Sequence, residues 1–304
     1  MISFAGVRRT AIFVATLLAA LALWAAPASA VAPPKVMAAL GDSITRAFNS
    51  DGPGCPTGPS LDCPRNSWST GTNPAVNSQF QRIQAIDPGR NPVAFNDAIT
   101  GARAGTDRLI DLVNQVPTAV SQDPDYVTIE IGANDACRSQ ITDQTPTDTF
   151  SAHVRTALTT LVTADPKVYI EMLSIPNINQ LHTIFTTPVP DLNALARWSA
   201  FNVCQALLAN PLSTEQADVD RRAAFRAQVI AYNGALADVC AEFKRCLFDN
   251  NAVFNSSFTA ADVATVTNTA PLPGIGSPAD YFHPSLLGQE SLAETSWAAT
   301  FPMN

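Results

Sequence analysis

The chain has little positive charge and few histidines. Its 304 residues include 18 lysines and arginines against 26 aspartates and glutamates, with three histidines and a net charge of −8. Nucleic-acid backbones are bound through clustered Lys and Arg, so this composition argues against a nucleic-acid partner. It also argues against strong electrostatic adsorption to anionic membranes.

Long hydrophobic runs are lacking after the first thirty residues. Residues 11–24 form an apolar run that follows two arginines and precedes a small-residue cleavage site ending at Ala30. This order is typical of a secretory signal peptide. The run is shorter than the roughly 20 residues that span a bilayer, although an uncleaved anchor is an alternative. We expect a secreted protein of residues 31–304, more acidic than the whole chain because the removed segment has two arginines and no acidic residue.

Cysteines are few, but their number is even. Six cysteines in an exported chain indicate three disulfides. No two of them have the spacing of a zinc knuckle and the histidines are scattered, so we expect no metal site and no organic cofactor. Six cysteines allow fifteen connectivities. We expect pairing in sequence order: Cys55–Cys63, Cys137–Cys204 and Cys240–Cys246.

Short apolar segments alternate with segments of helical pattern. This alternation predicts an α/β fold with a central, mainly parallel five-stranded sheet and helices on both faces. Strands are expected at 36–40, 93–99, 126–131, 168–173 and 246–249. Helices are expected at 105–116 with Thr106 or Asp107 as cap, at 149–162 with Thr147 or Asp148 as cap, and at 285–297.

Three stretches have an irregular composition: 50–77, 177–212 and 268–280. Long loops in compact domains are usually functional or disordered, so we expect these to form the walls and lid of a substrate cleft. The first could equally be an ordinary surface loop, and part of the second, 192–208, could be a helix. Four apolar residues of the second could line the lid or belong to the core: Leu181, Ile184, Phe185 and Trp198.

Small and polar residues follow the predicted strands, where a parallel sheet places its functional loops. Ser43 follows the first strand in a Gly-Asp-Ser turn, and a serine needs a base to become a good nucleophile. His283 is the candidate base, and Asp280, three residues earlier, is the candidate that orients it. Singly, Ser43 could be a turn or cap residue and His283 a structural one. His153 and His182 lack an equally convincing aspartate partner.

Two more residues could stabilise a developing oxyanion. Asn134 follows the third strand and could donate through its side-chain amide. Gly101 ends a loop after the second strand and could donate through its backbone N–H. The alternatives are an Asx-turn for Asn134 and a simple turn glycine for Gly101.

Together these residues resemble the SGNH/GDSL hydrolase family. Four blocks occur in the family's order: Gly41-Asp42-Ser43-Ile44, the loop ending at Gly101, Gly132-Ala133-Asn134-Asp135, and Asp280-x-x-His283. The resemblance covers nearly the whole mature chain. It implies a flavodoxin-like three-layer α/β/α sandwich, with 31–304 as one hydrolase domain that needs no cofactor.

The resemblance also implies roles for individual residues. Ser43 would be the nucleophile, His283 the base and Asp280 its orienting partner. The oxyanion hole would consist of the backbone N–H groups of Ser43 and Gly101 and the side chain of Asn134. Asp42 would tie down the turn.

Shorter segments are similar to the phospholipase B-like branch of this family: 66–71, 98–104 and 132–137. This similarity implies a lipid ester as substrate (a phospholipid, lysophospholipid or acylglycerol) and cleavage through an acyl-Ser43 intermediate. A carbohydrate acetylesterase is one alternative, and an inactive secreted binding module on the same fold is another. We expect a monomer that contacts a lipid surface at most transiently.

Overall fold

A computed structural model describes residues 32–50, 52, 54–55, 61–266 and 279–300. The expected signal peptide and most of the stretch 268–280 lie outside the described residues. Within the described part, five parallel strands form one sheet in the order β2-β1-β3-β4-β5. Their bounds are β1 (Val36–Gly41), β2 (Val93–Asn96), β3 (Tyr126–Glu130), β4 (Tyr169–Met172) and β5 (Cys246–Phe248).

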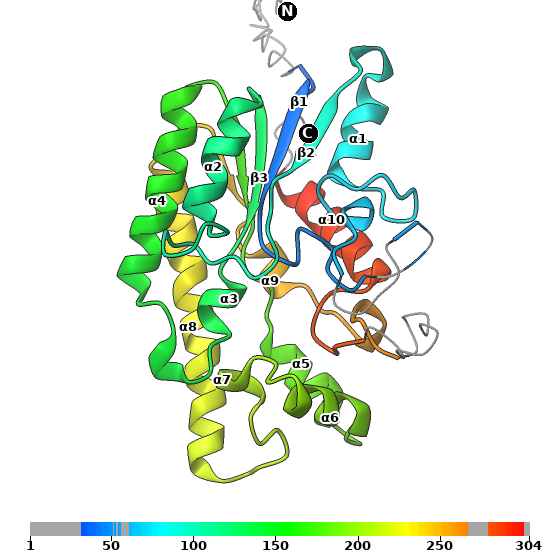
Figure 1. Cartoon of the computed structure of the whole chain (residues 1–304), viewed down its shortest axis with the longest axis vertical. Helices are drawn as coiled ribbons and strands as arrows, with labels where there is room; N and C mark the ends of the chain where they lie inside the picture. Colours follow the sequence, from blue (N-terminus) through cyan, green and yellow to red (C-terminus); the bar gives the residue numbers. More distant parts are fainter. Residues whose placement is uncertain (1–31, 51, 53, 56–60, 267–278, 301–304) are drawn as a thin grey trace, which may run out of the picture. The chain divides into compact units, whose positions relative to one another are not determined.

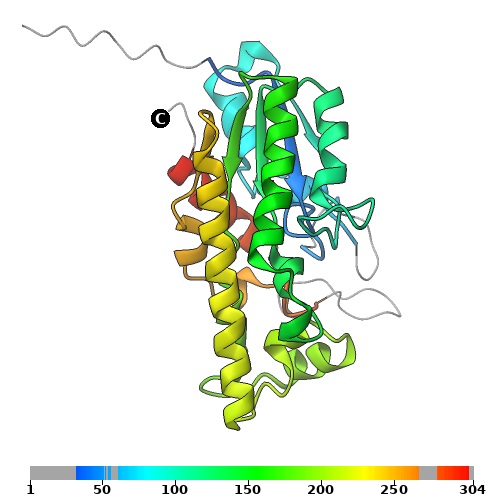
Figure 2. The ribbon, with the colours of Figure 1, turned by 90° about the vertical axis from the view of Figure 1, so that its left-hand side faces the viewer.

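Helices cover both faces of the sheet (Figures 1 and 2). One face carries α2 (Leu112–Ser121), α4 (Thr147–Ala164) and α8 (Gln216–Ala241). The other carries α1 (Gln79–Ile86), α9 (Ala252–Asn255) and α10 (Leu286–Thr300). This is the predicted flavodoxin-like three-layer α/β/α sandwich, and its sheet is wholly parallel in the described residues.

The central strands are buried on both faces. Four consecutive residues of β1, from Met37 to Leu40, are at most 1% exposed, and all five residues of β3 are buried. Such strands appear in a sequence as unbroken apolar runs, because helices cover each face. The edge strand β2 instead alternates between exposed and half-buried residues. The core therefore lies along β1 and β3, the two strands that lead into the candidate site.

Helix α2 begins at Leu112, seven residues later than predicted. The carboxylate of Asp111 accepts hydrogen bonds from the backbone N–H groups of Arg103 and Arg108, at 3.0 and 3.2 Å. These bonds hold residues 103–111 in turns, so the prediction of a cap at Thr106 or Asp107 was wrong. In α4 the predicted caps, Thr147 and Asp148, are the first two helical residues and Pro146 precedes them.

The stretch 177–212 is largely helical, with α5 (Asn179–Thr186), α6 (Leu192–Ala200) and α7 (Gln205–Leu208). The suggested single helix 192–208 is broken between α6 and α7. Cys204 there takes a left-handed backbone with φ of 42° and forms a disulfide with Cys137. Phe185 and Trp198 are 2% and 0% exposed, so these two side chains belong to the core rather than to a lid.

Helix α8 and helix α1 were not among the predicted helices. The buried side chains of α8 start only at Phe225, so its first nine residues carry no apolar stripe. In Figure 1 this part of α8 extends beyond the sheet, beside α7. A helix that is covered over only part of its length gives a weak periodic signal.

The stretch 50–77 is more than a surface loop. Trp68 is fully buried, and its backbone N–H donates to the Oε1 atom of Gln289 in α10 at 2.8 Å. Ser69 is also fully buried, and its hydroxyl lies 2.7 Å from that of Thr128 in β3. This segment therefore joins the sheet to α10.

The disulfides follow the order of the sequence, as expected. They join Cys55 to Cys63, Cys137 to Cys204 and Cys240 to Cys246. The second ties α3 (Ala133–Ala136) to the start of α7.

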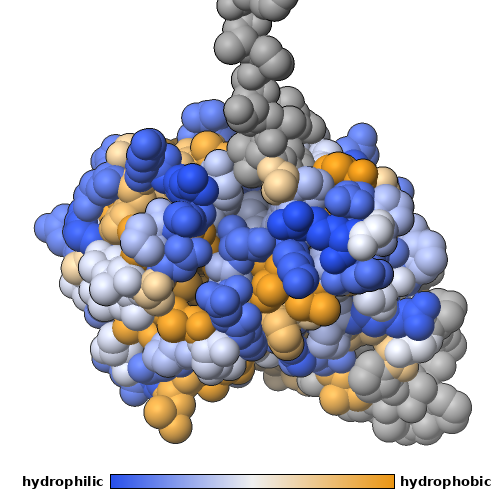
Figure 3. Space-filling view, turned by 90° about the horizontal axis from the view of Figure 1, so that it is seen from above, coloured by the Kyte–Doolittle hydropathy of each residue, from blue (hydrophilic) through white to orange (hydrophobic). Residues whose placement is uncertain are grey.

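The end of the molecule at which the strands begin is seen in Figure 3, where hydrophilic and hydrophobic residues are interspersed. The polar turns identified from the sequence gather at the opposite end of the sheet, above α5 and α6 in Figure 1. Over the described residues, no helix is both long and apolar enough to cross a membrane.

Candidate active site

Ser43 lies in a tight turn that begins where β1 ends. The backbone N–H of Arg46 donates to the carbonyl of Asp42 at 3.1 Å, and that of Phe48 to the carbonyl of Ser43 at 3.0 Å. Ahead of the turn, Gly41 has φ of 143°, and a Cβ there would lie 2.2 Å from the carbonyl oxygen of Glu130 in β3. Any side chain at position 41 would therefore push β1 away from β3 just before the serine.

The end of β1 is also held by a glutamine of α2. The side-chain amide of Gln115 accepts a hydrogen bond from the Gly41 N–H at 2.9 Å and donates one to the Gly41 carbonyl at 2.8 Å. Gln115 is 2% exposed. A buried pair of bonds of this kind replaces a sheet neighbour at the strand's end and fixes the direction in which the chain leaves β1.

His283 faces Ser43 across the carboxyl end of β1. Its Nε2 atom lies 2.8 Å from the Oγ atom of Ser43. Its Nδ1 atom lies 2.6 Å from the Oδ2 atom of Asp280. The structure thus brings together the three side chains that the sequence pattern selected, and each contact is within hydrogen-bond distance.

The segment that carries His283 is held from both sides. The other carboxylate oxygen of Asp280 accepts the backbone N–H groups of Phe282 and His283, both at 2.9 Å. The carbonyl of His283 accepts the N–H of Ala264 at 2.8 Å. Asp280 therefore closes a local turn and orients the imidazole at the same time.

Asn49 is a contributor that the sequence pattern did not indicate. Its side-chain amide donates to the Oδ2 atom of Asp280 at 2.8 Å, beside the bond to His283. Asn49 has a positive φ of 57° at the end of the Ser43 turn. An asparagine with positive φ is a signal for a turn but not for an active site, so this contact required the structure.

The charges around His283 favour its protonated form. Burial lowers the pKa of an imidazole, but the negative charge of Asp280 and its hydrogen bond raise it more, with smaller contributions from Asp42 and Asp62. The pKa of His283 is therefore above its ordinary value of 6.5. Burial raises the pKa of Asp280, yet the charge of His283 and the hydrogen bonds to it outweigh burial, so that pKa is lowered.

Asn134 and Gly101 lie near each other, as an oxyanion site would need. Asn134 is in the short helix α3, and its side-chain amide donates to the carbonyl of Ala102 at 3.0 Å and to the Oδ2 atom of Asp42 at 3.2 Å. Ala102 directly follows Gly101, which has a positive φ of 84°. Asn134 is therefore tied both to the Gly101 loop and to the residue before Ser43.

The backbone N–H groups of Ser43 and Gly101 are available as donors. Within the described part of the chain, neither has a hydrogen-bond partner. Both amide hydrogens of Asn134, by contrast, have acceptors, so donation to an oxyanion would require it to release or share one of them. The bond to Asp42 is the longer of the two.

Two buried carboxyl groups, one in the Ser43 turn and one in the neighbouring strand β3, lie close to the nucleophile's end of β1. Asp42 and Glu130 are both fully buried, and Glu130 pairs with Gly41 across the sheet. Burial raises the pKa of Asp42 to about 6. Burial and the neighbouring Asp42 raise the pKa of Glu130 well above its ordinary value. Burial and the charge of Asp42 thus favour the neutral form of Glu130, and the Oδ2 atom of Asp42 accepts the hydrogen bond from Asn134.

The other two histidines lie elsewhere. The Nε2 atom of His182, in α5, lies 2.7 Å from the carbonyl oxygen of Pro211, and burial lowers the pKa of His182. His153 is in α4, beside Gly105. In the described ranges no three His, Cys, Asp or Glu side chains are grouped so that they could hold a metal ion.

The family profile described as GDSL-like lipase/acylhydrolase matches residues 37–295. The chain belongs to this family. That match runs from β1 into α10 and so includes the Ser43 turn, the Gly101 loop, Asn134 and His283.

One relative matches about half of this chain. Membrane-associated phospholipase B1 of Rattus norvegicus is 29% identical over 181 residues, which are 51% of this chain but 12% of that protein. This chain thus matches only a small part of that much longer relative.

Two solved structures to which this chain is similar have different descriptions. One is described as a GDSL-like lipase from Parabacteroides merdae, with 16% identity, 87% of this chain and 94% of that chain covered, and a TM-score of 0.46. The other is a family two carbohydrate esterase from Clostridium thermocellum, with 14% identity, coverage of 87% and 62%, and a TM-score of 0.49.

Proposed function

We propose that this GDSL-like protein is a secreted serine carboxylic ester hydrolase that acts on lipid esters, with residues 31–304 as its catalytic domain. The observation that carries the proposal is the hydrogen-bonded series from Ser43 through His283 to Asp280, at 2.8 and 2.6 Å. This arrangement supports a nucleophile, its base and the group that orients the base. An inactive binding module would not need these three side chains to lie within hydrogen-bond distance of one another.

The reaction follows from the positions of these atoms. As the Oγ atom of Ser43 attacks the ester carbonyl carbon, its proton passes to the Nε2 atom of His283. When the carbon–oxygen bond to the alcohol breaks, His283 gives that proton to the leaving oxygen, and the acyl group remains on Ser43. Water then attacks the acyl-enzyme, His283 accepts a proton from the water and returns it to Ser43, and the acid leaves.

The negative charge on the carbonyl oxygen needs donors at each tetrahedral stage. The N–H groups of Ser43 and Gly101, which have no partner among the described residues, serve this role. Asn134 adds its side-chain amide by releasing Asp42. Such donors act only when the charge develops, so they lower the barrier rather than strengthen substrate binding. No step uses a metal or an organic cofactor.

Two features support a lipid ester over an acetylated sugar. The imidazole of His283 contacts two aromatic rings, and the ring centroids of Phe48 and Phe282 lie 4.7 and 5.2 Å from that of the imidazole. The relative with the 29% match is a phospholipase B. The competing substrate class is an acetylated carbohydrate. To distinguish the two, the same preparation is assayed on a long-chain phospholipid and on an acetylated sugar, and we expect faster hydrolysis of the phospholipid.

Secretion is supported by the three disulfides, which persist in oxidising compartments. Mass spectrometry of protein recovered from the medium tests this part of the proposal. We expect a mature N-terminus near Ala30, and retention of residues 1–30 in the mature protein would contradict it.

The role of Ser43 is tested with a chromogenic short-chain ester and an active-site fluorophosphonate. Ser43→Ala should abolish labelling and reduce turnover by about 10⁶-fold, as removal of a triad nucleophile does elsewhere. Ser139→Ala, at an exposed serine, is the matched control and should leave both unchanged. If Ser43→Ala keeps near-wild-type hydrolysis, Ser43 is not the nucleophile.

A further inference from the structure

The Gly101 N–H, one of the expected oxyanion donors, belongs to the central peptide of a tight turn. The backbone N–H of Ala102 donates to the carbonyl of Ile99 at 3.0 Å and closes this turn. Thr100 and Gly101 are its two central residues, and Gly101 has the positive φ of 84° that a type II turn requires there. The hydrogen bond that closes the turn does not involve the central peptide. The orientation of the donor therefore depends on what holds the two central residues.

Both central residues of this turn are held by side chains. The Nη2 atom of Arg108 donates to the carbonyl of Gly101 at 2.8 Å. The hydroxyl of Thr100 donates to the Oδ1 atom of Asp62. Arg108 follows Gly101 in the chain that leads to α2, whereas Asp62 comes from the separate stretch 50–77. The bond to Asp62 therefore fixes the turn relative to another segment of the molecule.

The segment 61–63 is itself bound to the Ser43 turn. The backbone N–H of Asn49 donates to the carbonyl of Leu61 at 3.0 Å. In return, the backbone N–H of Leu61 donates to the Oδ1 atom of Asn49 at 3.3 Å. The backbone beside Asp62 is thus fixed to the turn that carries the nucleophile, while the side chain of Asp62 reaches the other turn.

Arg46 completes the connection between Asp62 and the nucleophile. Its Nε atom donates to the Oδ2 atom of Asp62 at 3.0 Å, and its carbonyl accepts the N–H of Cys63 at 3.2 Å. The backbone N–H of Arg46 donates to the carbonyl of Asp42 at 3.1 Å. The two carboxylate oxygens of Asp62 therefore have different partners, because Oδ2 binds the Ser43 turn and Oδ1 binds Thr100.

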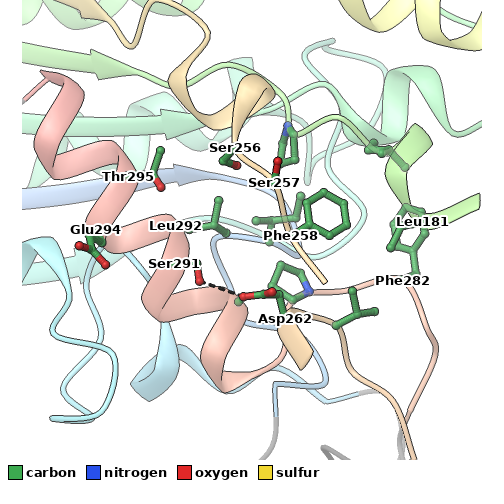
Figure 4. Close-up of a pocket in the computed structure, with 16 residues that line it drawn as sticks. Leu181, Ser256, Ser257, Phe258, Asp262, Phe282, Ser291, Leu292, Glu294 and Thr295 are labelled. Atoms are coloured by element: carbon green, nitrogen blue, oxygen red, sulfur yellow. Dashed lines mark hydrogen bonds between the residues drawn. The ribbon is translucent and has the colours of Figure 1, made fainter. Parts of the chain in front are cut away.

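Close packing does not fill the space between these two turns. Two pockets adjoin the nucleophile's turn, and they share no lining residue. One of them, shown in Figure 4, lies between α10 and the segment after α9 and takes Ile44 from the turn. The other, of about 370 Å³, is lined by Arg46 and Asp62 together with residues 96–99, which lead into the second turn. Because side chains do not fill this second space, hydrogen bonds through Asp62 rather than packing connect the two turns there.

We propose that Asp62 is a positioning residue for ester hydrolysis, which holds the Gly101 turn against the Ser43 turn so that both backbone N–H donors point at the same oxygen. This inference rests on the proposed ester hydrolase function. The donors act on charge that develops in the transition state, so a shift of one relative to the other lowers kcat and leaves substrate binding nearly as it was. A misplacement of about 1 Å can cost about 10²-fold in rate.

The contact between Thr100 and Asp62 is tested by removing the hydroxyl alone. Thr100→Val keeps the shape of the side chain and the charge of Asp62, and should lower kcat about tenfold on p-nitrophenyl butyrate with KM within about twofold. Thr100→Ser restores a hydroxyl and should recover most of the lost kcat. Thr163→Val, at an exposed threonine of α4, is the matched control and should change neither constant. Melting curves of the same samples show whether the variants are folded.

The pH profile separates positioning from an effect of charge. Asp62 is among the charges that raise the pKa of His283, after Asp280 and Asp42. Asp62→Ala should therefore move the midpoint of kcat/KM down as well as lower kcat, whereas Thr100→Val should lower kcat with the midpoint in place. The double variant should lose no more kcat than Asp62→Ala alone, because both changes break the same contact.

The outcomes distinguish this inference from the function on which it rests. If the wild-type protein hydrolyses no ester, both are wrong. If the wild type is active and Ser43→Ala is not, but Thr100→Val keeps the wild-type kcat, the hydrolase function is supported and Asp62 is not a positioning residue. A loss that appears in KM alone, or a loss in the double variant equal to the product of the two single losses, also overturns the assignment of Asp62.

Discussion

The pKa of His283 is determined by interactions that act in opposite directions. Burial favours the neutral imidazole, whereas Asp280 favours the charged one, and the charge of Asp280 prevails. The same pair lowers the pKa of Asp280, so the carboxylate stays ionised throughout the range in which the histidine titrates. A base of this kind is held in one tautomer and becomes competent only after it has lost its proton.

We therefore expect kcat/KM to rise with pH through a midpoint above 6.5, the ordinary pKa of histidine. Asp280→Asn should move this midpoint down, because the raising charge is gone, and should reduce kcat by about 10⁴-fold through loss of the correct tautomer. Rate profiles of both proteins on one short-chain ester measure the two effects. Asp143→Asn, at an exposed carboxylate, should change neither. A midpoint that stays in place in Asp280→Asn would contradict this account.

Asn134 is expected to act in the transition state rather than in ground-state binding. Asn134→Ala should lower kcat by about 10²–10³-fold and leave KM nearly unchanged, as removal of one oxyanion donor does. Steady-state kinetics and a melting curve of the same sample are the measurement. A rise in KM alone would assign Asn134 to substrate binding, and a large loss of stability would assign it to structure through Asp42 and Ala102.

Among the elements, α3 and α7 are tied to each other by a covalent link. The disulfide Cys137–Cys204 closes a loop with a sequence separation of 67 residues, which includes β4 and α5. It holds the residues that follow Asn134 against the start of α7. The loop closed by Cys55–Cys63 has a separation of only eight residues.

Loop length should separate the effects of these two disulfides. In the chain-entropy account, Cys137→Ala with Cys204→Ala costs about 4 kcal/mol of unfolding free energy, and Cys55→Ala with Cys63→Ala about 2.5 kcal/mol. Urea unfolding of both double variants, with the wild type, tests the order. A larger loss from the short loop would show that native contacts rather than chain entropy dominate.

The elements differ in how far they could be predicted. The five strands were predicted close to their observed bounds. For the central strands β1 and β3 this was possible because buried parallel strands are apolar runs followed by polar turns. The start of α2 was predicted wrongly, because the hydrogen bonds of Asp111 to residues 103 and 108 override the local helical pattern. The break between α6 and α7 ends at Cys204, whose disulfide partner lies 67 residues away in the chain.

Across the whole molecule, several buried carboxyl groups hold protons that the unfolded chain would release. Burial raises the pKa of Asp42 and Asp135 to about 6 and that of Glu171 to about 7. Glu171 lies between helix α1 and helix α10, where it accepts the side-chain amide of Gln79 at 2.8 Å and lies 2.7 Å from the hydroxyl of Tyr126. The sheet and both helices of that face meet at this acid.

These raised values set the direction of the pH dependence of stability. At these three carboxyl groups the folded state binds more protons than the unfolded state between their ordinary pKa values and about 7, so their contribution to the unfolding free energy falls as pH rises through this window. The pKa of His283 is also raised, so His283 likewise makes the unfolding free energy fall as pH rises above 6.5. We expect a lower melting temperature at pH 8 than at pH 5, measured by calorimetry.

Glu171→Gln identifies the contribution of one group. The amide keeps the size of the side chain and cannot ionise, so the fall in melting temperature from pH 5 to pH 8 should become smaller. Glu215→Gln, at an exposed glutamate, should leave the slope as it is. A melting temperature that rises between pH 5 and pH 8 in the wild type would show that other groups control stability in this range.

The sequence by itself determined the order of strands and polar turns, the family, and the candidate nucleophile, base and oxyanion donors. These depend on local composition and on motifs of a few residues. Only the tertiary structure decided that Ser43 and His283, 240 positions apart, lie 2.8 Å from each other. It also decided the contact of Asn49 with Asp280 and the burial of Glu130 beside Asp42. Each of these joins segments that are distant in the chain, and such contacts arise from packing of the whole sheet and its helices rather than from any local pattern.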